Sequence, residues 1–147
     1  YYTICGNGPD EDELRKLIHE KKLEKQVQLI GFRTDMNEIL QTADVFAFPS
    51  IREGLGIAAI EALACGVPLI VADNRGTREY LHNDKNGLIC DAFDRNAFVA
   101  AIDKVYSNVE YRKKLADYCR ESVIQFSTEE TVRTMERIYS TMDKRIS

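Results

Sequence analysis

Tryptophan is absent from this sequence of 147 residues, and histidine and proline are scarce, with two and three residues. The four cysteines form no Cys-x-x-Cys pair, and the two histidines lie far from each other. These spacings exclude the common zinc sites. The longest apolar run, residues 57–64, is interrupted by Glu61, so no segment approaches the ~20 residues of a membrane-spanning helix. Neither sign of charge dominates, because 20 basic side chains oppose 24 acidic ones, which argues against a nucleic-acid-binding protein.

The composition is typical of an ordinary globular protein. Hydrophobic residues make up 44% of the chain and charged residues 30%, and a chain of this length buries a core without disulfides or metals. We interpret the cysteines as small hydrophobic side chains and, without a signal-peptide pattern, expect a reducing, cytoplasmic environment. The chain has no initiator Met and starts directly with a strand-like segment. We therefore expect a piece of a longer protein.

Short apolar runs alternate with helical patterns along the chain. Strands are predicted at residues 2–5, 27–30, 45–48, 69–72 and 88–90, with helices between them and further helices starting at Asp94, Asn108 and Ser127, the last running to about residue 145. Such alternation predicts an α/β fold with a doubly wound, Rossmann-like parallel sheet. We expect a single domain over residues 1–147 with extra C-terminal helices. Ligands bind at the carboxyl ends of such strands, which directs attention to the loops 6–8, 31–34, 49–56 and 73–77.

The loop at residues 49–56 has the composition of an anion site. Gly54 and Gly56 remove side chains from a strand-to-helix connection, so a ligand could approach the backbone closely. The amides of Leu55, Gly56 and Ile57 would then point at a phosphate from a helix N-terminus. The alternative is a tight connection that merely requires two glycines.

Two carboxylates flank this helix start. Glu61 is the lone charge in an apolar helix, which predicts close burial against the sheet and a partner for its carboxylate. That partner is either a vicinal diol such as a ribose or an internal Arg or amide group. Glu53 lies at the open edge of the sheet, where it could accept hydrogen bonds from sugar hydroxyls; by itself it would be an ordinary loop residue.

Glu53, seven intervening residues and Glu61 stand within Pro-Ser-x-x-Glu-Gly-Leu-Gly and Glu-Ala-x-Ala-Cys-Gly-x-Pro. This pattern resembles the retaining nucleotide-sugar glycosyltransferases of the GT-B fold, family 4. Further segments resemble the same family in the same order, namely Gly6-Asn7-Gly8-Pro9, Gly31-Phe32-Arg33, Ala43-Asp44-Val45, Gly76-Thr77-Arg78-Glu79 and Asn86-Gly87-Leu88.

The resemblance implies a role for each matched position. Glu53, as the catalytic candidate, would contact the hydroxyls of the donor sugar, and Glu61 would hold the ribose. The loop with Gly54 and the amides of residues 55–57 would contact the diphosphate. Phe32 and Arg33 would flank the nucleobase, while the loop with Gly6 and Gly8 either faces the donor or only turns the chain. No metal and no cofactor are expected, because the nucleotide-diphosphate sugar is itself the substrate.

The resemblance also implies what the whole protein does. The chain would be the C-terminal, donor-binding half of a GT-B enzyme, without its first strand and helix and without the N-terminal domain. The enzyme would be a hexosyltransferase that uses a glycan or lipid-linked sugar as acceptor, in bacterial polysaccharide or cell-envelope synthesis. It would be cytoplasmic, peripheral to the inner face of the membrane through the missing domain.

Two departures from the family pattern concern positive charge and glycine. The Arg and Lys that clamp the diphosphate have no clear counterpart here, with Arg52, Arg75 and Arg78 as the available cations, and Arg75-Gly76 replaces a pair of glycines. A second hypothesis is therefore a non-catalytic nucleotide-binding or interaction module with the same fold.

Overall fold

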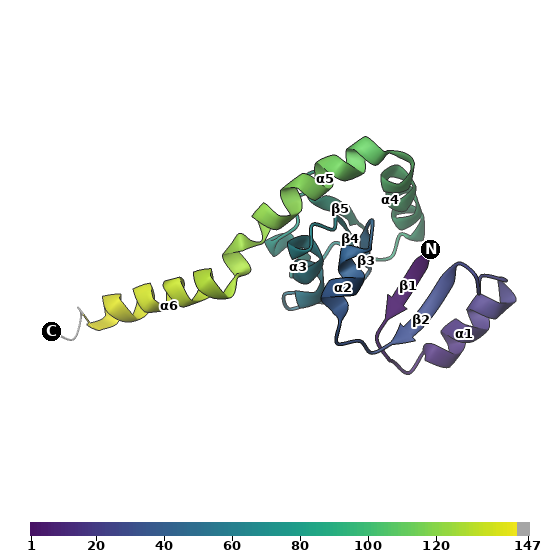
Figure 1. Ribbon diagram of the computed structural model, residues 1–147, viewed down its shortest axis with the longest axis horizontal. Helices are drawn as coiled ribbons and strands as arrows, with labels where there is room; N and C mark the ends of the chain where they lie inside the picture. The colour runs from purple at the N-terminus through teal and green to yellow at the C-terminus, as the bar shows by residue number, and fades with distance from the viewer. Residues whose placement is uncertain (144–147) are drawn as a thin grey trace. The chain divides into compact units, whose positions relative to one another are not determined.

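The structure of the chain, a computed structural model, describes residues 1–143 and contains two compact units (Figure 1). The first unit comprises residues 1–36 and the second starts at Asn37. Each unit has its own parallel sheet, with strands joined by helical connections. The predicted α/β class with parallel strands is confirmed, and the five strands are divided between two sheets.

The first unit is a strand–helix–strand arrangement. Strands β1 (Tyr2–Cys5) and β2 (Val27–Gly31) pair in parallel, with Ile4 opposite Leu29, and helix α1 (Glu11–Glu20) connects them. The first turn of α1 is acidic and its last turn carries a histidine, a distribution that suits the helix dipole. No residue of α1 is fully buried.

The second unit is organised around a three-stranded sheet in the order β3-β4-β5, with β3 at Phe46–Phe48, β4 at Leu69–Ala72 and β5 at Gly87–Cys90. All four residues of the central strand β4 are buried, as a continuous apolar strand covered on both faces requires. The preceding connections contain helix α2 (Met36–Gln41), which starts at the end of the first unit, and helix α3 (Ile57–Ala64). A short 3-10 helix, η1 (Thr77–Glu79), follows β4.

The remainder of the chain is helical, as predicted. Helix α4 (Arg95–Ser107) begins after Asp94, whose side chain accepts bonds from two backbone amides, and α5 (Val109–Ser122) begins after Asn108, which accepts one. The 3-10 helix η2 (Ile124–Phe126) leads to α6 (Thr128–Asp143). The Oγ of Ser127 accepts the Glu130 amide at 3.3 Å. These caps confirm the three helix starts predicted from the sequence.

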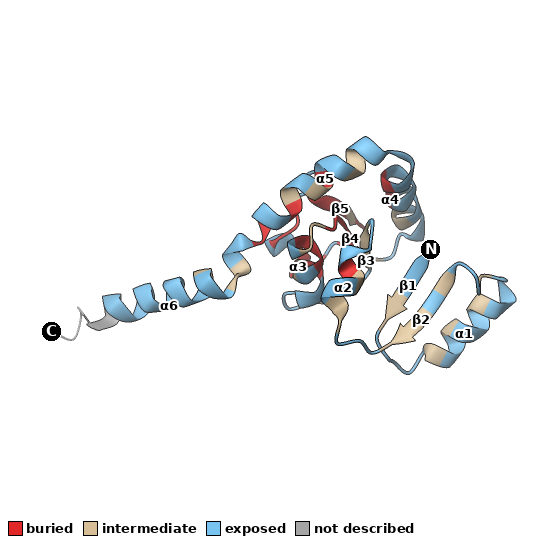
Figure 2. Ribbon diagram, in the orientation of Figure 1, coloured by how far each residue is buried: buried red, intermediate tan, exposed pale blue. Residues whose placement is uncertain are grey.

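The buried core lies where β4 and β5 pack under α4 and α5 (Figure 2). A buried amide also ties this region together: Nδ2 of Asn86 donates to the Tyr80 carbonyl and to Oγ of Ser122, each at 2.8 Å. Cys90 and Cys119 are buried and the other two cysteines are half-buried, all as free thiols. Burial raises the pKa of the Cys119 thiol to about 12. The cysteines therefore act mainly as packing groups, as predicted.

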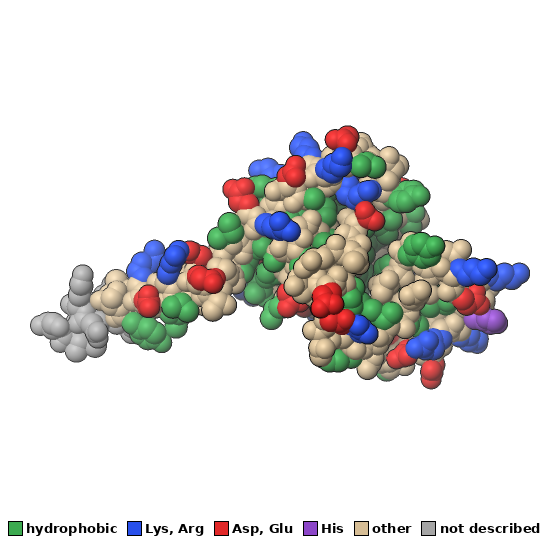
Figure 3. Space-filling model, viewed as in Figure 1, with side chains coloured by type: hydrophobic (Ala, Val, Ile, Leu, Met, Phe, Trp, Pro, Cys, Tyr) green, Lys and Arg blue, Asp and Glu red, His purple; other side chains and the backbone are tan. Residues whose placement is uncertain are grey.

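Helix α6 has an exposed apolar face. Its hydrophobic side chains Val132, Met135, Ile138 and Tyr139 are each more than two-fifths exposed, and such side chains are visible along α6 in Figure 3. Positions 144 and 145 of the predicted last helix, and the side chain of Met142, lie outside the described residues. Within residues 1–143, no helix is both long and apolar enough to cross a membrane.

Candidate functional site

A run of backbone amides without acceptors starts helix α3. Gly56 has the left-handed φ of +74° and precedes the first helical residue, Ile57, without any side-chain cap. The amides of Leu55, Gly56 and Ile57 donate to no acceptor among the residues that the structure describes. Adjacent unpaired N–H groups at the positive end of a helix are suited to bind an anion.

Glu53 is half-buried in the same loop. Oε1 of Glu53 accepts a hydrogen bond from Oγ of Ser50 at 2.7 Å. The carboxylate thus lies three residues before the left-handed Gly56, on the loop that follows the carboxyl end of β3. This position matches the predicted open edge, and the role of Glu53 toward a sugar stays a prediction.

The prediction that Glu61 is closely buried is wrong. Helix α3 buries only Ala59, Ala62 and Leu63, and Glu61 is exposed together with Ile57, one turn nearer to the helix start. The apolar composition of the helix concealed a solvent face that also carries Ile57, Ala58 and Ala64. Glu61 makes no ion pair or hydrogen bond within residues 1–143. Its carboxylate is therefore free to bind a ligand on the exposed face of α3, one turn after Ile57, whose amide is unpaired.

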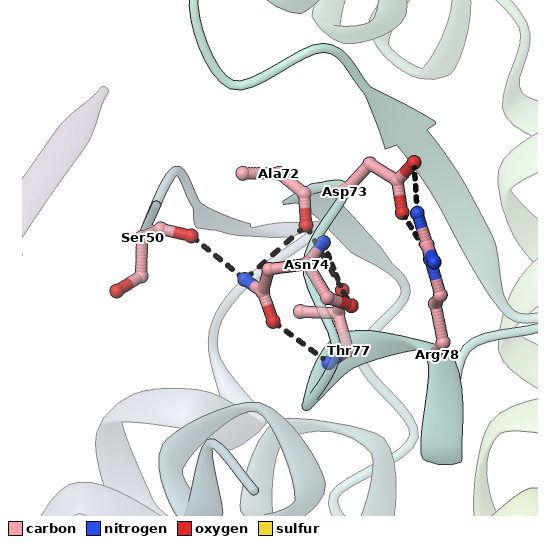
Figure 4. Close-up of polar contacts among 6 residues, drawn as sticks. All are labelled: Ser50, Ala72, Asp73, Asn74, Thr77 and Arg78. Carbon is pink, nitrogen blue, oxygen red and sulfur yellow. Dashed lines mark hydrogen bonds and ion pairs between the residues drawn. The ribbon is translucent and has the colours of Figure 1, made fainter. Parts of the chain in front are cut away.

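A polar network in the loop after β4 is joined to the loop 49–56 at Ser50 (Figure 4). Nδ2 of Asn74, in the loop after β4, donates to the Ser50 carbonyl at 2.8 Å, and its Oδ1 accepts the Thr77 amide at 3.0 Å. Oγ1 of Thr77 donates to the carbonyl of Ala72 at 2.9 Å. The sequence did not predict Asn74 and Thr77 as supports: Asn74 was marked only by its position in a loop at the carboxyl end of a strand, and Thr77 also by the segment that resembles the family.

Gly76 packs directly against the backbone of the same loop. A Cβ at this position would lie 2.9 Å from the Glu53 carbonyl oxygen and 3.0 Å from that of Gly54. The position therefore has room for glycine only. Gly76 therefore has a structural role against the loop 49–56, although Arg75 stands where the family pattern has a second glycine.

The available cations differ in how they are engaged. Arg78 donates two hydrogen bonds to the Asp73 carboxylate, at 2.7 and 2.9 Å (Figure 4), and this pairing lowers the pKa of Asp73. Arg52 and Arg75 are exposed on the loops after β3 and β4, with no ion-pair partner within residues 1–143. Arg52 and Arg75 therefore form no ion pair with a carboxylate within residues 1–143.

The other predicted site residues lie in the first unit, on the loops after β1 and β2. Oδ1 of Asn7 accepts the Phe32 amide at 3.0 Å, and the Gly6 amide donates to the Gly31 carbonyl at 2.7 Å. The Phe32 side chain is 74% exposed, while Arg33 pairs with the Asp35 carboxylate and lowers its pKa. A Cβ at Gly6 or Gly8 would meet no atom within 4 Å. The bonds from Asn7 and Gly6 join this loop to the loop that presents Phe32, and whether Gly6 and Gly8 also face a donor stays a prediction.

The structure therefore groups the predicted residues in two sets. Gly6, Gly8, Phe32 and Arg33 lie together in the first unit, and Glu53, Glu61 and the loop between them lie together in the second. Within residues 1–143, no group of three or more His, Cys, Asp or Glu side chains is arranged to hold a metal ion.

The second unit thus combines parallel strands, a helix start with unpaired amides and two nearby carboxylates, an arrangement suited to a phosphorylated ligand. Residues 1–122 match the family model of the glycosyl transferases group 1, so the chain belongs to this family. It is 36% identical over 138 residues to EpsD of Bacillus subtilis (strain 168), a protein named as a glycosyltransferase, and this match covers 94% of the chain and 36% of EpsD. It is 30% identical to the lipopolysaccharide core biosynthesis glycosyltransferase LpsE of Rhizobium meliloti (strain 1021), covering 88% of the chain and 38% of LpsE.

Solved structures agree with this assignment. The chain superimposes on TarM of Staphylococcus aureus, in a complex that contains UDP, with a TM-score of 0.85 and 26% identity, covering 93% of the chain and 28% of TarM. The fold is thus that of the GT-B glycosyltransferases. The chain spans less than two-fifths of the length of EpsD and LpsE.

Proposed function

We propose that this chain is the C-terminal, donor-binding domain of a retaining hexosyltransferase of family 4. The enzyme transfers a sugar from a nucleotide-diphosphate sugar to an acceptor hydroxyl. One observation carries the proposal: the unpaired amides of Leu55, Gly56 and Ile57, held open by the left-handed Gly56, stand between the carboxylates of Glu53 and Glu61. This arrangement suits a ligand that has a diphosphate in its centre and hydroxyls at both ends.

Three parts of the donor then have a binding group in the second unit. The helix amides bind the diphosphate, Glu61 binds the ribose and Glu53 binds the hydroxyls of the transferred sugar. The protein contributes orientation and stabilisation of the charge on the departing diphosphate. Glu53 and Glu61 do not form a glycosidase pair, because the second carboxylate binds the nucleoside and not the reacting carbon.

The acceptor belongs to a part of the enzyme outside this chain. In support, the chain spans 36% of EpsD and 38% of LpsE, and α6 exposes an apolar face that another domain could cover. The acceptor is a glycan or lipid-linked sugar, in bacterial polysaccharide or cell-envelope synthesis, and the N-terminal domain brings the enzyme to the inner face of the membrane. The name of LpsE, which places that relative in lipopolysaccharide synthesis, supports this setting.

Calorimetry tests the proposed function. We expect the chain to bind UDP or GDP weakly, to release little or no heat with uridine or guanosine, and to keep the same affinity in EDTA, because backbone amides bind the diphosphate. The nucleosides are the matched control, since they lack only the phosphates. Absence of binding to every nucleoside diphosphate contradicts the proposal, and a signal lost on chelation contradicts its metal-free part.

Glu61→Gln is expected to weaken binding of UDP more than binding of 2′-deoxy-UDP. A hydrogen bond to a charged group is worth about 1.5–3 kcal/mol, so we expect a loss of about tenfold or more for the ribonucleotide and a smaller loss for the deoxy ligand, which has already lost one of the two hydroxyls. Glu121→Gln is the control, because Glu121 is an exposed carboxylate on α5. Equal losses for both ligands would assign Glu61 a structural role.

A further inference from the structure

Tyr80 carries a hydroxyl that has no partner in the structure. Its side chain is fully buried, and the Tyr80 hydroxyl is the only buried side-chain nitrogen or oxygen without a hydrogen bond within residues 1–143. A buried polar group left unpaired is costly, and native proteins rarely keep one without a reason. No motif in the sequence indicates a role for Tyr80.

The hydroxyl lies directly beneath the loop 49–56. A Cβ built on Gly56 would lie 2.7 Å from the Tyr80 hydroxyl oxygen, 3.1 Å from the Phe48 ring and 3.8 Å from Cγ of Glu53. The Tyr80 hydroxyl and the side chain of Glu53 thus both approach the position that a Cβ on Gly56 would occupy. No ligand can touch Tyr80 directly, because its side chain has no exposed surface.

The tyrosine is fixed in this position from two sides. Its ring packs edge-on against Phe126 with a centroid distance of 6.5 Å, and its carbonyl accepts a hydrogen bond from Asn86 at 2.8 Å. The side chain is thus packed away from solvent. The loop 49–56 approaches its hydroxyl at Gly56 and is where we look for an acceptor.

Glu53 is the acceptor that the surroundings offer. Its Oε1 already accepts from Ser50, and a carboxylate has capacity for further hydrogen bonds. Burial, with a further contribution from the charge of Glu53, raises the pKa of Tyr80 to about 12. The phenol consequently stays protonated at neutral pH and is a hydrogen-bond donor.

We propose that Tyr80 is a positioning residue for Glu53: when the donor binds, its hydroxyl donates to the Glu53 carboxylate and holds it toward the hydroxyls of the transferred sugar. Ser50 and Tyr80 thus offer Glu53 two alternative donors, one used in the present structure and one reserved for the bound state. This inference rests on the proposed function, because it requires Glu53 to contact the sugar.

The test compares Tyr80→Phe with the wild type in the full-length gene product that contains this chain. A panel of UDP-glucose, UDP-galactose, UDP-N-acetylglucosamine and GDP-mannose first identifies a nucleotide sugar that the wild type binds. We expect Tyr80→Phe to bind that nucleotide sugar about 5–20-fold more weakly and the free nucleoside diphosphate with unchanged affinity. The melting temperature of the unliganded variant should be unchanged or raised, because an unpaired buried hydroxyl has been removed.

Two further comparisons exclude a merely structural effect. Tyr118→Phe removes a hydroxyl that makes no hydrogen bond to residues 1–143 and should change neither affinity. In a Glu53→Ala background, Tyr80→Phe should lower the affinity for the nucleotide sugar much less than it does in the wild type, because the acceptor is already absent and residues that act through one another give non-additive losses.

Each result has a distinct meaning. Equal nucleotide-sugar affinity in Tyr80→Phe and the wild type overturns the role of Tyr80 and leaves the proposed function standing. Parallel losses for nucleotide sugar and diphosphate, with a lower melting temperature, also overturn it. Failure of the wild type to bind any nucleotide or nucleotide sugar overturns the proposed function and this inference with it. If Tyr80→Phe does not fold, NMR of the wild type labelled with ¹³Cζ-tyrosine decides. The ¹³Cζ resonance of a solvent-protected tyrosine must change its chemical shift when the nucleotide sugar binds and not when the free nucleoside diphosphate binds. Absence of that change overturns the proposal.

Discussion

Gly56→Ala is expected to lower the free energy of unfolding by about 2–4 kcal/mol and to abolish binding of nucleoside diphosphates. Gly56 has a φ of +74°, and a Cβ there would lie 2.7 Å from the buried Tyr80 hydroxyl and 3.1 Å from the Phe48 ring. Backbone strain and overpacking therefore act together. Because the Tyr80 side chain is fully buried and has little room to move, we expect the loop to shift and its amides to lose their arrangement. Urea unfolding and calorimetry with UDP and GDP measure the two effects.

Gly54→Ala is the matched control for this prediction. Gly54 lies two residues earlier in the same loop, is exposed, and would place a Cβ with no heavy atom within 4 Å. Its stability should remain within about 0.5 kcal/mol of the wild type. If Gly56→Ala and Gly54→Ala are equally stable, the steric account of Gly56 is wrong.

The 147-residue chain is expected to transfer sugar at least about 10⁵-fold more slowly than the full-length gene product. Holding donor and acceptor together in one site is worth up to about 7–11 kcal/mol, and the proposed function places the acceptor site outside this chain. A transfer assay across nucleotide sugars and acceptors, run on both proteins at equal concentration, measures the ratio. Slow hydrolysis of the donor is compatible with this expectation, because water requires no binding site.

The control for this comparison is nucleotide binding by the short chain itself. Binding of UDP or GDP shows that the donor side is folded, so that a lost transfer rate reflects the missing acceptor side. Comparable transfer by both proteins would place the acceptor site within these 147 residues and contradict the assignment of the chain as one half of an enzyme.

The secondary structure was largely determined by local sequence. Continuous apolar runs predicted all five strands, and the central one, β4, is buried throughout. Asp94, Asn108 and Ser127 predicted helix starts because a side chain of this type accepts amides two or three residues ahead. Such interactions depend on near neighbours in the chain and can therefore be derived from sequence.

The surroundings of the candidate site were decided by tertiary structure. Glu61 was predicted to be buried from the composition of its helix, but burial depends on which face of α3 meets the sheet, and Glu61 lies on the other face. Composition alone cannot distinguish these faces, since alanine occurs on both.

The Glu53 and Glu61 motif could be found from sequence, and the supports beneath it could not. Asn74 reaches the Ser50 carbonyl across 24 residues of sequence, and Tyr80 lies under Gly56 without any hydrogen bond that a pattern could suggest. Gly76 packs against the Glu53 and Gly54 carbonyls from a different loop. These contacts arise only when parallel strands bring their carboxyl ends to one edge of a sheet. Local sequence therefore determined the helices, the strands and the motif, while the packing of distant segments determined which side chains are exposed, which are hydrogen-bonded and which are buried without a partner.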